Sequence, residues 1–294
     1  MSKTIFQGCA TAIITPFTSD GVDYNSLKKL VDFQIAEGID AIVVCGTTGE
    51  ASTMSYAEKM RTIETVLTQA NGKIPIIAGT GSNCTEAAIA MSRDAERLGV
   101  DAVLVVTPYY NKATQTGLIR HYETIADSIT TPVILYNVPS RTGVSCTAET
   151  YAALSRHPNI AGTKEASGNL ALVQKTREFC QKDFSIWSGN DDETAPIMLL
   201  GGSGVISVVS NVIPSHMNQL THACLNREFE KAGKLQLEIR SLIESLLCEV
   251  NPIPVKTALS LMGYCEEIFR LPLCRMSDAN RCKLREILLA RHLI

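Results

Sequence analysis

Eight short apolar runs recur along the chain, and they restrict its fold more than any other feature. They are Ala10–Ile14, Ala41–Cys45, Ile74–Ala78, Ala102–Val106, Val133–Tyr136, Ile160–Lys164, Ser185–Ser188 and Gly204–Val208. Their apolar character is continuous rather than alternating, as expected of parallel strands that are buried on both faces. Successive runs begin roughly 20 to 33 residues apart, which is the length of one strand-plus-helix unit. The pattern therefore predicts eight βα units.

The segments between these runs have helical patterns with recognisable ends. Ser55 and Glu58 have the spacing of a capping box that begins a helix. A second helix is predicted from Thr85 to Leu98, where Gly99 ends it. The sequence Gly-Ile-Asp-Ala-Ile-Val-Val at 38–44 returns as Gly-Val-Asp-Ala-Val-Leu-Val at 99–105, two units later. Eight such units favour a closed (β/α)8 TIM barrel, because closure leaves no exposed sheet edge.

The apolar runs cease after about residue 215, and the remaining chain has only helical patterns. Helices are predicted at Phe229–Cys248, Val255–Met262 and Ser277–Leu293, with proline-containing breaks between them. We therefore expect residues 1–224 to form a catalytic barrel and residues 225–294 to form a C-terminal helical domain.

The composition excludes several classes of protein. A net charge of −3 gives no electrostatic footprint for nucleic acid or for an acidic membrane surface. No run of about 18 apolar residues is present, so no membrane span is expected, and the first residues lack the apolar core of a signal peptide. The ten cysteines form no CxxC pair and no metal-binding group with histidines. We therefore expect reduced thiols, no metal site and a cytoplasmic protein.

Lys164 closes the sixth run, and a lysine at the end of a buried strand is costly. Burial disfavours its charged form, but a desolvated amine also becomes a nucleophile toward carbonyl carbon. The alternative is that Lys164 reaches solvent or pairs with Glu165. Neighbouring residues on a strand point to opposite faces, which makes Glu165 a poor partner.

Other polar side chains follow the runs at the ends that a barrel gathers at one mouth. The second run ends in Gly-Thr-Thr-Gly-Glu at 46–50, the fourth in Thr-Pro-Tyr-Tyr-Asn at 107–111, and the fifth in Tyr-Asn-Val-Pro-Ser-Arg at 136–141. If the barrel forms, these loops bring five side chains toward Lys164, namely Thr47, Thr48, Tyr110, Tyr136 and Arg141. Such surroundings favour a catalytic amine over a structural lysine.

Other candidate site residues are weaker. Lys256 is the second-best lysine, but we expect it to be half-exposed on a C-terminal helix. Asp191, Asp192 and Glu193 are consecutive acids at a predicted helix start, where capping and the helix dipole account for them better than metal binding does.

Five separated motifs closely resemble those of the dihydrodipicolinate synthase family of pyruvate-dependent aldolases, in the same order. They are Gly46-Thr-Thr-Gly-Glu, Val106-Thr-Pro-Tyr-Tyr-Asn, Tyr136-Asn-Val-Pro-Ser-Arg-Thr-Gly, Gly162-Thr-Lys-Glu-Ala-Ser-Gly-Asn and Asn251-Pro-Ile-Pro-Val-Lys. The resemblance implies a TIM barrel with three C-terminal helices, in a homotetramer built from two tight dimers. It also implies the cofactor-free condensation of pyruvate with L-aspartate-4-semialdehyde, the first committed step toward diaminopimelate and lysine.

The resemblance assigns catalytic roles to four residues. Lys164 forms a Schiff base with the keto carbon of pyruvate, and Tyr136 is the proton carrier. Thr47 and Tyr110 match a threonine and a second tyrosine that complete a proton relay. Tyr110 is expected to reach in from the neighbouring subunit.

The resemblance also assigns substrate-binding roles. Thr48 holds the pyruvate carboxylate, Arg141 grips the semialdehyde carboxylate, and Gly189 and Ile206 line the site mainly through their backbone. The closest rival function is that of an N-acetylneuraminate or keto-deoxy sugar acid lyase, which shares the lysine chemistry. Those relatives tend to have Ser-Thr in place of Thr47 and Thr48, and they lack the arginine. A more distant rival is a barrel that binds a phosphorylated ligand or nicotinamide without lysine chemistry.

Two departures from the family pattern are visible. Asn190 replaces the first aspartate of the usual Ser-Gly-Asp-Asp sequence. At the positions that bind feedback lysine in sensitive members, Tyr56 and Lys59 replace two histidines and Ala87 replaces an acid. The site has thus gained a cation and lost an anion, and we expect weak or absent inhibition by lysine.

Overall fold

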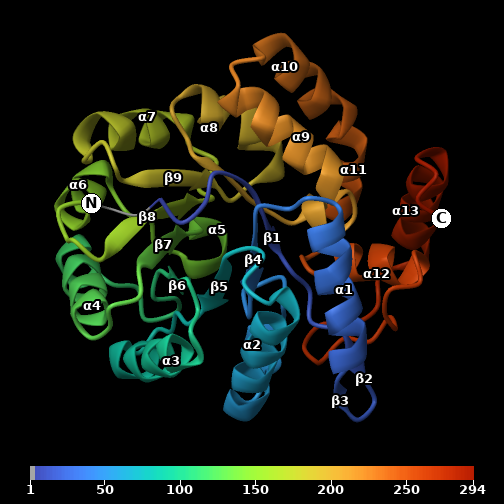
Figure 1. The fold of residues 1–294 in the computed structure, drawn as a ribbon, viewed down its shortest axis with the longest axis horizontal. Helices are drawn as coiled ribbons and strands as arrows, with labels where there is room; N and C mark the ends of the chain where they lie inside the picture. The colour runs from blue at the N-terminus through green and yellow to red at the C-terminus, as the bar shows by residue number, and fades with distance from the viewer. Residues whose placement is uncertain (1–3) are drawn as a thin grey trace.

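The computed structural model describes residues 4–294 and contains a closed barrel of eight parallel strands (Figure 1). The strands are β1 (Gly8–Ala12), β4 (Ala41–Val44), β5 (Ile76–Gly79), β6 (Ala102–Val106), β7 (Val133–Asn137), β8 (Ile160–Glu165), β9 (Ser185–Ser188) and β10 (Gly204–Ser207). Each strand pairs with its neighbours along the chain, and β1 pairs with both β4 and β10 to close the barrel. The predicted (β/α)8 fold is confirmed, and each apolar run overlaps one barrel strand.

Eight helices form a ring around the strands (Figure 1). They are α1 (Tyr24–Ala36), α2 (Tyr56–Ala70), α3 (Thr85–Leu98), α4 (Gln115–Asp127), α6 (Ala148–Leu154), α7 (Leu170–Phe179), α8 (Thr194–Leu199) and α9 (Pro214–Leu225). Short helical turns lie in the loops at η1 (Ala51–Thr53), α5 (Pro139–Thr142), η2 (Asp191–Glu193) and η3 (Val209–Asn211). The predicted capping box is present at Ser55 and Glu58, and α3 ends at Gly99 with a left-handed φ of 90°.

The strands bury both of their faces, in two separate cores. The inner core fills the barrel with alternating small and large side chains, such as Ala12, Ala41, Ile206 and Trp187. Phe6 stacks on Trp187 with 5.0 Å between ring centroids and so packs into this core. The outer core lies between the strands and the ring of helices. Burial on both faces is the physical reason that the apolar runs are continuous rather than alternating.

The C-terminal part consists of α10 (Phe229–Glu238), α11 (Arg240–Leu246), α12 (Ile253–Leu261) and α13 (Asp278–Ala290). The prediction of a single helix over Phe229–Cys248 is wrong, because the chain breaks at Ile239. This residue is fully buried and caps both helices, so that α10 packs against α9 while α11 packs against α13. The division into two domains after residue 224 stays a prediction.

A short hairpin between β1 and α1 was not predicted. Its strands, β2 (Phe17–Thr18) and β3 (Gly21–Val22), have two residues each, which is too short for an apolar pattern to show. Phe17 is nevertheless 1% exposed, and its ring centroid lies 4.2 Å from Lys256 Nζ and 4.3 Å from Arg270 Cζ. Within residues 4–294, none of the helices combines the length and the apolar character needed to cross a membrane.

Candidate functional site

Lys164 lies on β8 and is directed away from its neighbour Glu165. Lys164 is 5% exposed, and its Nζ lies 4.6 Å from the centroid of the Tyr136 ring. The two residues are paired across β7 and β8. Glu165 accepts hydrogen bonds from Tyr151 at 2.7 Å and from Asn137 at 3.0 Å. The alternative in which Glu165 neutralises Lys164 is therefore excluded by geometry.

Burial controls the charge of the Lys164 amine. The pKa of Lys164 is lowered from 10.5 to about 8, mainly by desolvation, which the Asp191 carboxylate opposes and the nearby Arg141 reinforces. An amine with a pKa near the working pH is neutral often enough to attack a carbonyl carbon.

Tyr136 is buried beside this amine and is held in its protonated form. Desolvation raises the pKa of the Tyr136 phenol, while Arg141 and a hydrogen bond from Thr47 partly offset that effect. A protonated phenol near an amine, with a hydroxyl beside it, can donate a proton and take it back. The structure thus brings Thr47, Tyr136 and Lys164 together, as the sequence predicted.

A cavity of about 380 Å³ opens beside Tyr136. Its lining includes Thr47 and Arg141 and extends to Tyr109 and Lys59. The lining residues carry two cationic side chains and no carboxylate. This charge distribution suits a ligand with carboxylate groups, and the guanidinium fork of Arg141 matches carboxylate geometry.

Thr48 is buried, and its hydroxyl is held by the C-terminal part of the chain. Asn251 Nδ2 donates to Thr48 Oγ1 at 3.1 Å, and Arg141 Nη2 donates to the Asn251 carbonyl oxygen at 3.3 Å. Asn251 Oδ1 is buried without a hydrogen-bond partner among the described residues. Asn251 therefore belongs to the site although it was not predicted as a site residue. The signal was its place at the start of the Asn-Pro-Ile-Pro-Val-Lys motif.

Gly189 follows β9 and leaves room for the lysine side chain. A Cβ at this position would lie 2.6 Å from Ala166 Cβ, closer than packed atoms allow, and 3.1 Å from Lys164 Cε, which is tight. Ile206 is fully buried in the inner core.

Asn190 donates from Nδ2 to Glu193 Oε2 at 2.8 Å. An aspartate at 190 would face that carboxylate with a like charge, which gives the asparagine a local reason.

Tyr110 is not brought to the other site residues within one chain. It is 91% exposed and has a φ of 72°, an uncommon backbone conformation for a residue other than glycine. Its proposed role therefore depends on a second subunit.

Asp191 plays a larger part than its sequence context suggested. It is 6% exposed, and its Oδ2 accepts from the backbone N–H groups of Val208 and Val209 at 3.0 and 3.1 Å. Its carboxylate thus caps the start of η3, whereas the sequence suggested that it would cap the exposed start of its own helix. Its influence on the Lys164 pKa makes it part of the electrostatic surroundings of the site.

The expectation for Lys256 is wrong, because this residue is 0% exposed. Its Nζ forms an ion pair with Glu50 and donates to the Ile268 carbonyl oxygen at 3.1 Å. The ring of Phe17 lies 4.2 Å away, centroid to Nζ. With its amine enclosed in this way, Lys256 is not a rival for Lys164 as the nucleophile.

A TIM barrel with a buried lysine of lowered pKa at the carboxyl end of β8 is the arrangement expected of lyases that act through a lysine amine. The family model described as "Dihydrodipicolinate synthetase family" matches residues 5–291. The chain belongs to this family.

Individual relatives agree with that membership. The 4-hydroxy-tetrahydrodipicolinate synthase of Thermoanaerobacter sp. (strain X514) is 50% identical over 285 residues, which are 97% of this chain and 96% of the relative. The chloride-inhibited dihydrodipicolinate synthase of Acinetobacter baumannii, complexed with pyruvate, is 43% identical, with a TM-score of 0.97 over 99% of this chain and 100% of the other. The Cyanidioschyzon merolae enzyme with lysine bound is 38% identical, with a TM-score of 0.96 over 99% and 100%.

Proposed function

We propose that this enzyme is a 4-hydroxy-tetrahydrodipicolinate synthase, which condenses pyruvate with L-aspartate-4-semialdehyde. The observation that carries the proposal is the buried Lys164 amine, with its lowered pKa, which lies against the ring of Tyr136. Tyr136 in turn lines a cavity whose wall carries two cationic side chains and no carboxylate. The names of the relatives support this substrate pair, and pyruvate is the ligand of the Acinetobacter baumannii structure. The reaction belongs to the diaminopimelate route to lysine.

The mechanism begins when the neutral Lys164 nitrogen attacks the keto carbon of pyruvate. The carbinolamine loses water to give a protonated Schiff base, and loss of a methyl proton converts this to an enamine. The enamine carbon then attacks the aldehyde carbon of the second substrate, the aldehyde oxygen takes up a proton, and the Schiff base forms again. The amino group of the second substrate then attacks the Schiff-base carbon, which closes the ring and releases the Lys164 amine. Tyr136 carries these protons, with Thr47 hydrogen-bonded to its phenol. No cofactor is needed, because the iminium itself acts as the electron sink.

Substrate binding uses the residues at the strand ends. Thr48 holds the pyruvate carboxylate, and Arg141, on the cavity wall, grips the carboxylate of the semialdehyde through paired donors. Gly189 leaves the space that a Cβ would fill next to the lysine stem. Ile206 contributes to the apolar wall beneath.

The active unit in this proposal is a homotetramer built from two tight dimers. Tyr110 completes the proton relay of the neighbouring subunit, which accounts for a tyrosine that is 91% exposed and absent from its own cavity. We place the enzyme in the cytoplasm, where the ten free thiols would stay reduced.

Borohydride trapping tests the chemistry directly. Incubation with pyruvate and borohydride should add one reduced pyruvate to the peptide that contains Lys164, and Lys164→Ala should abolish the adduct. An adduct on Lys256, or none on the folded protein, would refute the mechanism. A coupled assay of pyruvate with the semialdehyde, compared with pyruvate and N-acetylmannosamine, distinguishes this synthase from a sugar acid lyase.

A further inference from the structure

The loop that carries Thr47 and Thr48 has little backbone support of its own. Between Gly46 and Glu50, it is held by backbone bonds from Glu50 N to the Thr47 carbonyl oxygen at 3.1 Å and from Ala51 N to the Gly46 carbonyl oxygen at 3.4 Å, and by the Thr15 hydroxyl, which donates to the Gly49 carbonyl oxygen at 2.7 Å. Glu50 is 2% exposed and has a left-handed φ of 52°. A non-glycine residue keeps this conformation only where its surroundings hold it there.

We propose that the ion pair between Lys256 and Glu50 is a positioning device, through which the C-terminal helices hold Thr47 and Thr48 in place for the reaction. Neither residue touches the reacting atoms, so both act through the loop. This inference rests on the proposed function and adds positioning residues to it.

The ion pair is enclosed by the surrounding side chains and backbone. The Lys256 amine pairs with Glu50 Oε1, donates to the Ile268 carbonyl oxygen and faces the rings of Phe17 and Phe269. Both side chains of the pair are 0% exposed. Water cannot substitute for either partner there, so the carboxylate is fixed to one point of the C-terminal part.

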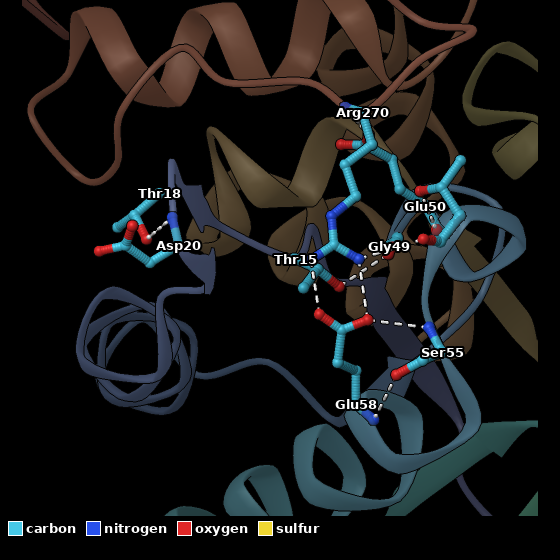
Figure 2. A network of polar contacts seen from close by, with 9 residues as sticks. Thr15, Thr18, Asp20, Gly49, Glu50, Ser55, Glu58 and Arg270 are labelled. Atoms are coloured by element: carbon cyan, nitrogen blue, oxygen red, sulfur yellow. Dashed lines mark hydrogen bonds and ion pairs between the residues drawn. The ribbon is translucent and has the colours of Figure 1, made fainter.

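A second contact from the same part of the chain holds the far end of the loop (Figure 2). Arg270 donates from its backbone N to Glu50 Oε2 at 3.4 Å, and its guanidinium donates to the Thr53 carbonyl oxygen at 3.1 Å. The guanidinium also binds both carboxylate oxygens of Glu58, at 2.8 and 2.5 Å. Glu58 belongs to the capping box of α2, so Arg270 joins Glu50 of the loop to the start of this helix.

The same C-terminal stretch also reaches the substrate side of the loop. Asn251, at the start of the motif that ends in Lys256, donates to Thr48 Oγ1. The motif therefore contacts the loop at Thr48 and at Glu50, on either side of Gly49. Two contacts on a loop of five residues fix its orientation as well as its position.

The test removes both charges together, because removal of one would leave an unpaired buried charge and risk unfolding. The double variant Glu50→Gln with Lys256→Met should stay folded, with an unfolding midpoint close to that of the wild type. Its kcat/KM for pyruvate should fall at least tenfold, with slower borohydride trapping at Lys164. Amide hydrogen exchange should accelerate in residues 46–54 and remain unchanged in α3.

The matched control is a second ion pair of the C-terminal part, Arg281 with Glu267 at 3.1 Å, which contacts no residue of the loop. Arg281→Met with Glu267→Gln should leave the kinetics and the exchange of 46–54 unchanged. If the first double variant does not fold, Glu50→Asp serves instead, since it keeps both charges and shortens the arm by one methylene. Glu50→Asp should also raise the KM for pyruvate.

A folded double variant, or a folded Glu50→Asp variant, with wild-type kinetics and wild-type exchange would overturn the proposal. Equal losses in the Arg281 and Glu267 control would also overturn it, since they would show a general effect of the C-terminal part. Failure of the proposed function is a separate result, because the wild type would then trap no pyruvate. Hydrogen exchange would still report whether the pair holds the loop.

Discussion

Replacement of the buried lysine proposed as the nucleophile by an apolar residue of similar length is expected to stabilise the protein at neutral pH. The variant is Lys164→Met. Burial lowers the pKa of Lys164 from 10.5 to about 8, so the folded state resists carrying the ammonium that the unfolded chain carries freely. At 1.36 kcal/mol per pKa unit, this difference costs the folded state about 3 kcal/mol.

The sign follows from proton linkage. Between pH 8 and pH 10.5 the unfolded chain binds the proton of Lys164 and the folded chain does not, so the stability of the wild type rises with pH across this window. The penalty is fully present below pH 8 and disappears as the pH passes 10.5. The advantage of Lys164→Met should therefore be about 3 kcal/mol at pH 7 and should shrink steadily above pH 8.

Urea unfolding of the two proteins at pH 7 and at several higher pH values measures this difference. Lys28→Met is the control, since Lys28 is an exposed lysine on α1, and it should change stability little at any pH. The same pKa makes the rate of pyruvate trapping in the wild type rise with pH and level off above about pH 8. A Lys164→Met variant less stable than the wild type at pH 7, or a trapping rate that still rises at pH 10, would refute the reasoning.

Four further outcomes are expected. Arg141→Ala should lower the specificity constant for the semialdehyde about tenfold or more, since a hydrogen bond to a charged group is worth about 1.5–3 kcal/mol; pyruvate trapping should be nearly unaffected, and an equal loss of trapping would show that the arginine supports the structure of the barrel mouth. Mixed oligomers of Tyr110→Phe and Lys164→Ala chains should regain activity that neither parent shows, and verified hetero-oligomers without recovery would argue against a role in trans. Lysine should inhibit weakly or not at all, because the Lys59 ammonium lines the cavity and repels a cationic ligand by roughly 1–4 kcal/mol; strong inhibition at sub-millimolar lysine would contradict this. Gly189→Ala should fold but trap pyruvate poorly, because the added Cβ would lie 3.1 Å from the lysine Cε, and normal trapping would show that the loop can shift.

Features that depend on neighbouring residues could be predicted from the sequence. Continuous apolar runs predicted the barrel strands, because a parallel strand covered on both faces has no polar side to show. The direction of Lys164 also followed locally, since alternation along a strand separates it from Glu165 whatever the rest of the fold is. The capping box of α2 belongs to the same group, because its donors and acceptors lie three residues apart.

Features that depend on packing between distant segments were decided only by the tertiary structure. Lys256 looked like a half-exposed helix residue, but its partner Glu50 is 206 positions away in the chain, and no local pattern reports that distance. Asn251 donates a hydrogen bond to Thr48, which lies 203 positions away in the chain. Asp191 accepts hydrogen bonds from the backbone at the start of η3, a contact that forms only in the folded chain. The helix break at Ile239 has the same origin, because burial of one side chain between two packing partners outweighs helical propensity. The sequence alone therefore determined the barrel and the position of the lysine proposed as its nucleophile. The electrostatic surroundings of that nucleophile, and the hold of the C-terminal helices on the loop beside it, exist only after the chain has folded, since charges act through space and not along the chain.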